Sequence, residues 1–458
     1  MTTVASGQDC ETSALMEDGG EAGGHMQGSS RCSVYQASFL IVAAVVGLGI
    51  MALPSSIAKL GWVPGLGALV LLFAVNMYTG LILWRLRVAI PGGVSYTHLG
   101  AELMGNAGQA CCRAVSLTQL FMLEAEYLLV NTQSLATLFP SVQLCQPTWG
   151  LVMGALLLPL VQIRTLHHVS FLSAASGAAV LLVLLICMRE MLWGQGGSTE
   201  ESRSQVTTTH WATGAGVVDS FHALASIVFA CGSHFMYLEV MGEMKNVSQF
   251  PAAMNLAGVF VLGSYVVISA AGYGAYGEGV RAYAVDVLPP GPARQAASLL
   301  MLLHTMVSYI LMNQILCASL LQLSCLRIYK SPDSPASASR EDWLLVSALV
   351  LMASFLVANV VPFFEDLTVI IGSLIGAPIC FGIPATFLLR AHSQVRTAIR
   401  WYIELVEYGL VHKLSCGIDE RSRQAFCIMR SKVMVWRAEG GNLFLDALLF
   451  RWIALSVQ

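Results

Sequence analysis

Residues 38–62, SFLIVAAVVGLGIMALPSSIAKLGW, decide the fold of this chain. The stretch is apolar and long enough to cross a bilayer, yet Gly47, Gly49 and Pro54 stand in its middle. Gly and Pro interrupt the hydrogen-bond ladder of a helix, and free backbone groups are costly in hydrocarbon. Such a break persists where the backbone lines a cavity or is buried in protein, as in the substrate sites of secondary transporters. A kinked structural helix is the simpler alternative, because Gly is common in membrane spans.

The composition is that of a membrane protein. Of the 458 residues, 56% are hydrophobic and 11% are charged, and the mean hydropathy is +0.68. A soluble chain of this length needs more charge to cover its surface, so we expect a polytopic all-α protein in contact with membrane lipid. The sequence has no basic stripe for nucleic acid and no evident obligate protein partner. It also has no metal-ligand or nucleophile–base spacing, so we expect no metal, no cofactor and no enzymatic activity.

Apolar windows of about 20 residues predict ten membrane spans. These spans cover residues 38–60, 63–86, 108–138, 148–163, 169–193, 217–238, 254–276, 296–326, 343–361 and 367–389. They lie in a transmembrane domain of residues 34–395, preceded by a polar, disordered cytosolic tail over residues 1–33. Residues 396–458 predict interfacial helices or a poorly formed eleventh span. Lys and Arg concentrate on the loops that are cytosolic when the N-terminus is cytosolic, which is the orientation we expect. The sequence leaves the plasma membrane and the vacuolar or lysosomal membrane open.

The first break suits a zwitterionic ligand. We expect the second half of the helix to restart at Pro54, because Pro has no N–H and fits a first turn. The preceding amides then face a cavity at the positive end of a half-helix and can bind a carboxylate. Carbonyls released near Val46 can accept from an ammonium group. The predicted substrate-binding residues here are Val46, Gly47, Leu48, Gly49 and Ile50.

A second break is predicted in the sixth span, within FACGSH at residues 229–234. Gly flanked by Ser and His forms helix poorly. Two interrupted spans, five apart, indicate an inverted-repeat transporter with its site between them. The predicted substrate-binding residues here are Ala230, Cys231, Gly232, Ser233 and His234. His234 is predicted to act as a gate, a substrate contact or a proton relay, whereas neighbouring helices are expected to satisfy His222 and His304.

Four further polar residues are candidates for ion coupling. Glu124 and Glu126 lie near the middle of the third span, where a carboxylate is costly enough to suggest a function. They project about 200° apart on a helix, so both cannot face one cavity. Proton coupling is one interpretation of this pair and a hydrogen bond between helices is the other. Thr305 and Ser308 lie one turn apart and either coordinate sodium with carbonyls of the first break or bond to their own helix.

Several blocks resemble the amino acid/auxin permease family. GLGIMALP at 47–54, followed by LGWVPG at 60–65, resembles the opening signature of that family. EVMGEMKN at 239–246 and FPAAMN at 250–255 resemble the end of its sixth helix, and SYTHLGAE at 95–102 and GAP at 376–378 also fit. The resemblance covers roughly residues 36–395. Residues 401–458 depart from the family pattern because they contain no clear eleventh span.

The resemblance implies a leucine-transporter-type fold, a five-plus-five inverted repeat of about ten helices with a possible eleventh. It also implies transport of amino acids, usually driven by protons or sodium. We therefore predict secondary active transport of small neutral amino acids coupled to protons. The alternatives are sodium-coupled transport, and a membrane sensor that binds an amino acid without net transport.

Overall fold

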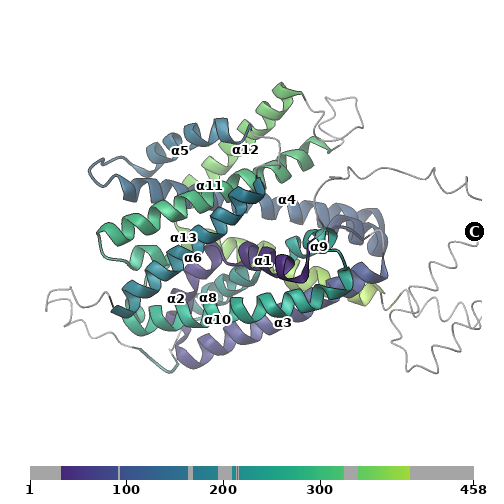
Figure 1. Ribbon diagram of the computed structural model, residues 1–458, viewed down its shortest axis with the longest axis horizontal. Coiled ribbons are helices and arrows are strands. Elements are labelled where there is room, and N and C mark those ends of the chain that lie inside the picture. The colour runs from purple at the N-terminus through teal and green to yellow at the C-terminus, as the bar shows by residue number, and fades with distance from the viewer. Residues whose placement is uncertain are drawn as a thin grey trace, which may run out of the picture.

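The computed structural model describes residues 32–90, 93–162, 169–193, 209–212, 214, 216–323, 339–391 and 393. Within these ranges the chain is helical, apart from loops and one isolated bridge between Cys32 and Met244 (Figure 1). The predicted tail, except for its last two residues, and the predicted C-terminal region of residues 396–458 lie outside the described residues.

Every predicted span coincides with helix. The helices are α1 (Val34–Val45), α2 (Leu48–Leu60), α3 (Trp62–Ala89), α4 (Tyr96–Leu138), α5 (Gln146–Leu160), α6 (Val169–Trp193), α8 (Val217–Cys231), α9 (His234–Glu243), α10 (Phe250–Tyr276), α11 (Pro292–Leu321), α12 (Arg340–Val360) and α13 (Phe364–Ile370). Short 3₁₀ turns occupy Val247–Gln249, Gly277–Gly279 and Ala284–Val287. The last span continues from α13 through π-helical turns at Ile371–Gly376 and Pro378–Gly382 to Ala391.

Not all of these helices are long and apolar enough to cross a membrane by themselves. Among the described residues seven meet that condition, and eight do so if α1 and α2 count as one bent span. Of the ten predicted spans, two do not meet the condition. These are the span at α5, which has only 15 residues, and the span at α4, which carries two acids in its middle. The chain is therefore a multi-pass membrane protein, whereas ten spans and an inverted repeat stay predictions.

The first break lies between α1 and α2, whose axes differ by 60°. Val46 and Gly47 are its only non-helical residues. The prediction that the helix restarts at Pro54 is wrong, because α2 begins at Leu48 and contains Pro54. The ring of Pro54 packs on Gly272 of α10, where a side chain would come within 2.7 Å of the ring.

The second break lies between α8 and α9, at Gly232 and Ser233. Gly232 has φ −74° and ψ 80°, and Ser233 has φ −121° and ψ 8°, so neither continues the helix of α8. The predicted interruption of the sixth span is therefore confirmed.

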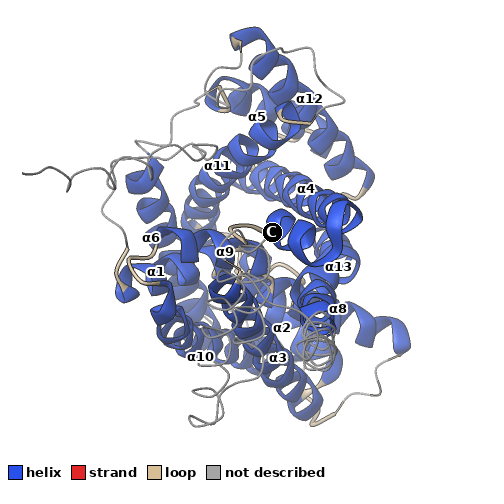
Figure 2. Cartoon of the chain, turned by 90° about the vertical axis from the view of Figure 1, so that its right-hand side faces the viewer, coloured by secondary structure: helices blue, strands red, loops and turns tan. Residues whose placement is uncertain are grey.

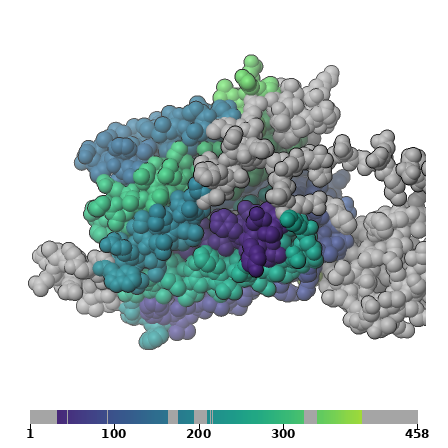
Figure 3. Space-filling model, viewed as in Figure 1, coloured from purple at the N-terminus to yellow at the C-terminus, as the bar shows by residue number. Residues whose placement is uncertain are grey.

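The helices pack in two groups (Figure 2). In one group, α4 contacts α5, α11 and α12, with an apolar core that includes Trp149, Met153 and Leu157. In the other group, α1, α2, α3, α8, α9 and α10 contact one another. The groups are joined by α6, which contacts both α10 and α11, by α13 and the π-helical turn after it, which contact both α8 and α4, and by a direct contact of α4 with α9. In the space-filling view α1 reaches the surface between α6 and α10 (Figure 3).

The two broken helices approach each other closely. A Cβ built on Gly49 of α2 would lie 2.5 Å from Cα of Ala230 of α8, which is closer than carbon atoms approach in proteins. Glycine at position 49 therefore lets the two backbones touch. This contact sets both breaks side by side at one end of a cavity.

Candidate functional site

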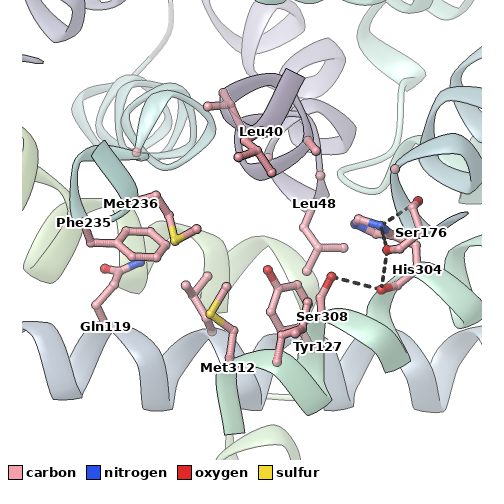
Figure 4. Close-up of a pocket in the computed structure, with 18 of the residues that line it drawn as sticks. Leu40, Leu48, Gln119, Tyr127, Ser176, Phe235, Met236, His304, Ser308 and Met312 are labelled. Carbon is pink, nitrogen blue, oxygen red and sulfur yellow. Dashed lines mark hydrogen bonds between the residues drawn. The ribbon is translucent and has the colours of Figure 1, made fainter. Parts of the chain in front are cut away.

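A cavity of about 510 Å³ lies between the two groups of helices. Gly47, Leu48, Gly49, Ala230 and Gly232 supply the part of its wall that comes from the breaks. Other polar or aromatic groups of the wall come from α4, α6, α9 and α11 and include Gln119, Tyr127, Ser176, Phe235, His304 and Ser308 (Figure 4). The cavity is large enough for an amino acid.

Half of the predicted substrate-binding residues lie on this wall and half do not. Val46, Ile50, Cys231, Ser233 and His234 are outside the lining and are buried among other helices. The helical period explains the position of Ile50, Cys231 and His234, because residues along a helix point to different sides. Val46 and Ser233 are non-helical residues of the breaks themselves. The sequence locates the break but does not reveal which side faces the cavity.

The first turn of α2 opens into the cavity. Gly47 is its N-cap residue, and no side chain caps this turn within the described part of the chain. Free amides at a helix N-terminus carry partial positive charge and attract anions. Because Gly47 and Gly49 have no side chains, a ligand can reach the backbone directly.

The carbonyl groups at the breaks are satisfied differently. The hydroxyl of Tyr265 on α10 lies 2.6 Å from the oxygen of Ala230 and 3.1 Å from the oxygen of Val45. Nδ2 of Asn76 on α3 donates to the oxygen of Cys231 at 2.8 Å. At the first break, where a ligand ammonium group was predicted to bind carbonyls near Val46, the oxygen of Val45 thus already has Tyr265 as a protein partner.

Sequence reasoning missed Tyr265 and Asn76. An asparagine in the middle of the apolar span 63–86 was a usable signal, because polar side chains inside a membrane usually serve as hydrogen-bond partners. Tyr265 gave no comparable signal, because a tyrosine in a membrane span reads as an ordinary amphipathic aromatic residue.

His234 contacts α3 and does not line the cavity. Its Nε2 lies 2.8 Å from Oγ1 of Thr79, and its Nδ1 lies 3.5 Å from Nδ2 of Asn76. Both ring nitrogens thus face polar groups of α3, and the residue is fully buried. The geometry places His234 in the contact between α9 and α3, whereas its predicted role in transport stays a prediction.

His304 of α11 lies on the cavity wall. Its Nδ1 is 2.8 Å from Oγ and 3.2 Å from the backbone oxygen of Ser176 on α6. The expectation that neighbouring helices satisfy this histidine therefore holds for Nδ1. In Figure 4 the ring lies beside Ser176, at the opposite end of the cavity from Gln119 and Phe235.

The two acids of α4 are buried outside the cavity lining. Thr368 of α13 donates to Oε1 of Glu126 at 2.7 Å, and Asn313 of α11 donates to Oε2 of Glu124 at 3.4 Å. They therefore face different neighbours, as their spacing predicted, and each forms a hydrogen bond between helices. Their role in proton coupling stays a prediction.

Thr305 and Ser308 also have protein partners. Oγ1 of Thr305 donates to Oδ1 of Asn131 at 2.7 Å, and this threonine is outside the cavity lining. Ser308 lines the cavity, and its hydroxyl donates to the backbone oxygen of His304 at 2.9 Å. The predicted sodium ligation by this pair stays a prediction.

The described lining of the cavity reaches one end of the molecule. It extends to Glu239 and Glu243, which are exposed near the end of α9. At the other end, Lys59 of α2 forms an ion pair with Glu365 of α13, and Nδ1 of His222 lies 3.7 Å from the same carboxylate. A separate cavity of about 390 Å³ lies around Lys59 and Glu365.

Fold and site together define a multi-pass helical membrane protein with a cavity between two broken helices. Residues 30–411 match the family described as transmembrane amino acid transporter protein. The match covers most of the chain, so the chain belongs to this family. The predicted membership of the amino acid/auxin permease family is confirmed, and because the family consists of transporters, so is the prediction that the chain is not an enzyme.

The relatives are distant but match over most of the chain. Amino acid transporter AVT1E of Arabidopsis thaliana is 22% identical over 368 residues, which cover 78% of this chain and 66% of the relative. The vesicular inhibitory amino acid transporter of Homo sapiens is 24% identical over 405 residues, which cover 81% of this chain and 71% of the relative. The chain thus spans about two thirds of the length of these relatives.

One solved structure of low similarity is a sialic acid symporter coupled to Na⁺, in a substrate-bound outward-open state. It is 15% identical, with a TM-score of 0.43, and the match covers 83% of this chain and 85% of the other. At this TM-score the likeness supports no conclusion about the present fold.

Proposed function

We propose that this chain carries out secondary active transport of small neutral amino acids, coupled to protons. The observation that carries the proposal is the uncapped first turn of α2, which opens into the cavity at the break between α1 and α2. The names of the relatives, which include an amino acid transporter and a vesicular inhibitory amino acid transporter, support amino acids as the substrates.

Each end of an amino acid has a distinct place in the proposed complex. The carboxylate binds the amides of Leu48 and Gly49, because they lie at the positive end of α2 and have no side-chain partner there. The ammonium group faces the oxygens of the opposite wall, from Tyr127 and Ser308. The amides and the two hydroxyl groups are neutral. A zwitterion can therefore bind them without a further charge on its side chain.

The wall also favours a neutral substrate side chain. The acidic groups in the cavity lining, Glu239 and Glu243, lie on α9 toward the open end. Glu239 is five residues beyond the start of α9, which places it about 7.5 Å further along the helix axis. At the breaks, among the described residues, the lining contains apolar, glycine and neutral polar groups.

The conformation fits one state of an alternating-access cycle. With the N-terminus in the cytosol, the open end of the cavity faces inward, and the pair of Lys59 and Glu365 closes the outer end. Both side chains are partly exposed, and pairs of this kind contribute only about 0–1 kcal/mol. Breaking this ion pair therefore costs little, and in the proposed cycle the two groups of helices rock about the substrate.

Uptake into proteoliposomes tests the proposal. Purified protein is reconstituted, and accumulation of labelled alanine, glycine or glutamine is measured under an imposed pH gradient, with sodium replaced by choline. We expect accumulation that follows the pH gradient and stops when a protonophore collapses it. Accumulation that requires sodium would show that sodium, and not the proton, is the coupling ion. Binding without any flux, by protein of confirmed fold, would overturn transport and favour the sensor.

A further inference from the structure

The two ring nitrogens of His304 have different surroundings. Nδ1 is 3.2 Å from the backbone oxygen of Ser176, and a carbonyl oxygen can only accept a hydrogen bond. The hydrogen of the neutral ring therefore lies on Nδ1, and the lone pair lies on Nε2. Within the described part of the chain Nε2 has no hydrogen-bond partner, although the residue is only 5% exposed.

Nε2 points at the first break. A Cβ built on Gly47 would lie 3.6 Å from this nitrogen, which is the nearest atom that it would meet. Since Gly47 has no side chain, only open cavity separates the imidazole from the first turn of α2. A buried lone pair and a set of free amides thus face the same small volume.

We propose that Nε2 of His304 binds the transported proton and then donates a hydrogen bond to the carboxylate of the amino acid. This inference deepens the proposed function and rests on it. The ligand is thus an amino acid carboxylate shared between the amides of α2 and an imidazolium group.

The helix dipole explains why proton and substrate bind together. An imidazolium beside the positive end of α2 is repelled by the amides while the site is empty. A bound carboxylate reverses this interaction, because it forms a charge-assisted hydrogen bond with the protonated ring. Each ligand therefore raises the affinity for the other by the same factor.

The other titratable groups near the cavity are less suited to this role. Tyr127 faces the cavity from α4, and Glu239 and Glu243 lie on α9 in the exposed mouth. From α6 and α11 the described lining contributes only neutral groups besides His304. His234 has polar partners at both nitrogens.

Two substitutions separate the ring nitrogens of His304. His304→Asn retains a polar group near Ser176 and removes Nε2, whereas His304→Gln places a group that does not titrate near the position of Nε2. His210→Gln is the control, because His210 is a half-exposed histidine outside the cavity. Apparent substrate affinity is measured between pH 5 and 8 in all four proteins, together with counterflow and uptake driven by a pH gradient.

For the wild type and His210→Gln we expect affinity to rise as pH falls, by up to about tenfold per pH unit. For both His304 variants we expect weaker binding that does not change with pH, and counterflow without accumulation. A His304 variant with the wild-type pH dependence would overturn the inference and leave amino acid transport intact. A wild type that neither binds nor transports amino acids would instead refute the proposed function.

A measurement on the wild type covers the case in which both variants fail to fold. A pH indicator in weakly buffered detergent solution reports protons taken up on substrate binding. Uptake approaching about one proton per bound amino acid is expected when the pH is above that at which the empty site titrates. Substrate binding without proton uptake across the whole pH range would overturn the inference.

Discussion

Tyr265→Phe tests how the two breaks are held together. Tyr265 is fully buried on α10, and its hydroxyl lies within hydrogen-bond distance of the oxygens of Ala230 and Val45. These oxygens belong to the last residue of α1 and to the second-to-last residue of α8, which are the half-helices that precede the breaks. The substitution removes the hydroxyl and keeps the ring, including its edge contact with Phe73 at 6.5 Å between centroids.

The expected loss of folding free energy follows from the number of hydrogen-bond donors that the substitution removes. A buried carbonyl that loses its partner costs about 1–3 kcal/mol. A hydroxyl has one hydrogen, so the two carbonyls share one donor and the total stays near about 1–3 kcal/mol. We therefore expect the folding equilibrium constant to fall roughly 5- to 150-fold.

Unfolding by sodium dodecyl sulfate in mixed micelles measures this change. Tyr78→Phe is the matched control, because Tyr78 lies on α3 with 54% of its surface exposed, and surface substitutions usually stay within about 0.5 kcal/mol. If the unfolding free energies of the two variants agree within that margin, the hydroxyl of Tyr265 does not stabilise the breaks and the reasoning fails.

Three further predictions concern packing, orientation and coupling. Gly49→Val should lower the thermal stability of the purified protein far more than Gly67→Val, because a side chain at 49 strikes α8 and nothing lies within 4 Å at 67; equal losses would contradict the close contact. A hydroxyl neighbour lowers the pKa of the exposed Cys145 thiol, so more of it is thiolate at a given pH, and an impermeant maleimide should label it from outside at lower pH than an ordinary thiol. Labelling of Cys145 from the cytosolic side alone would show that the orientation is opposite to the predicted one. If His304 carries the proton, Glu124→Gln and Glu126→Gln should keep the wild-type pH profile of uptake. A flattened profile in either variant would assign proton binding to that glutamate of α4 instead.

Sequence reasoning predicted the position of the membrane helices closely, because burial in lipid requires long apolar windows. The fifth predicted span and α6 have the same bounds, 169–193. The range of α4 contains two helices that meet at a kink at Gly105, and the predicted span begins three residues after this kink, at residue 108. The first part of α4 carries the mixed sequence SYTHLGAE, which an apolar window does not detect. The chain changes direction at Gly105, which has φ +67°.

The candidate site was predicted less completely. Gly47 and Gly232 mark the breaks because glycine lowers helix stability wherever it occurs. Pro54 does not mark the start of a helix, because it lies inside α2 and its ring packs on Gly272 of α10, a contact that the sequence does not show. Which histidine faces the cavity depends on the rotation of each helix about its axis. Packing against other helices sets that rotation, and a single sequence does not contain it.

The division of polar groups at the breaks bears on how the site can work. The carbonyls of Val45 and Ala230 share one hydroxyl, so the two broken helices are tied to each other through α10. The amides of α2 and Nε2 of His304 belong to opposite groups of helices and have no protein partner between them in the described structure. A carboxylate bound there connects the two groups, and its loss separates them. The proposed rocking motion therefore depends on the contact that the substrate itself completes, while the hydroxyl of Tyr265 contacts both breaks in this conformation.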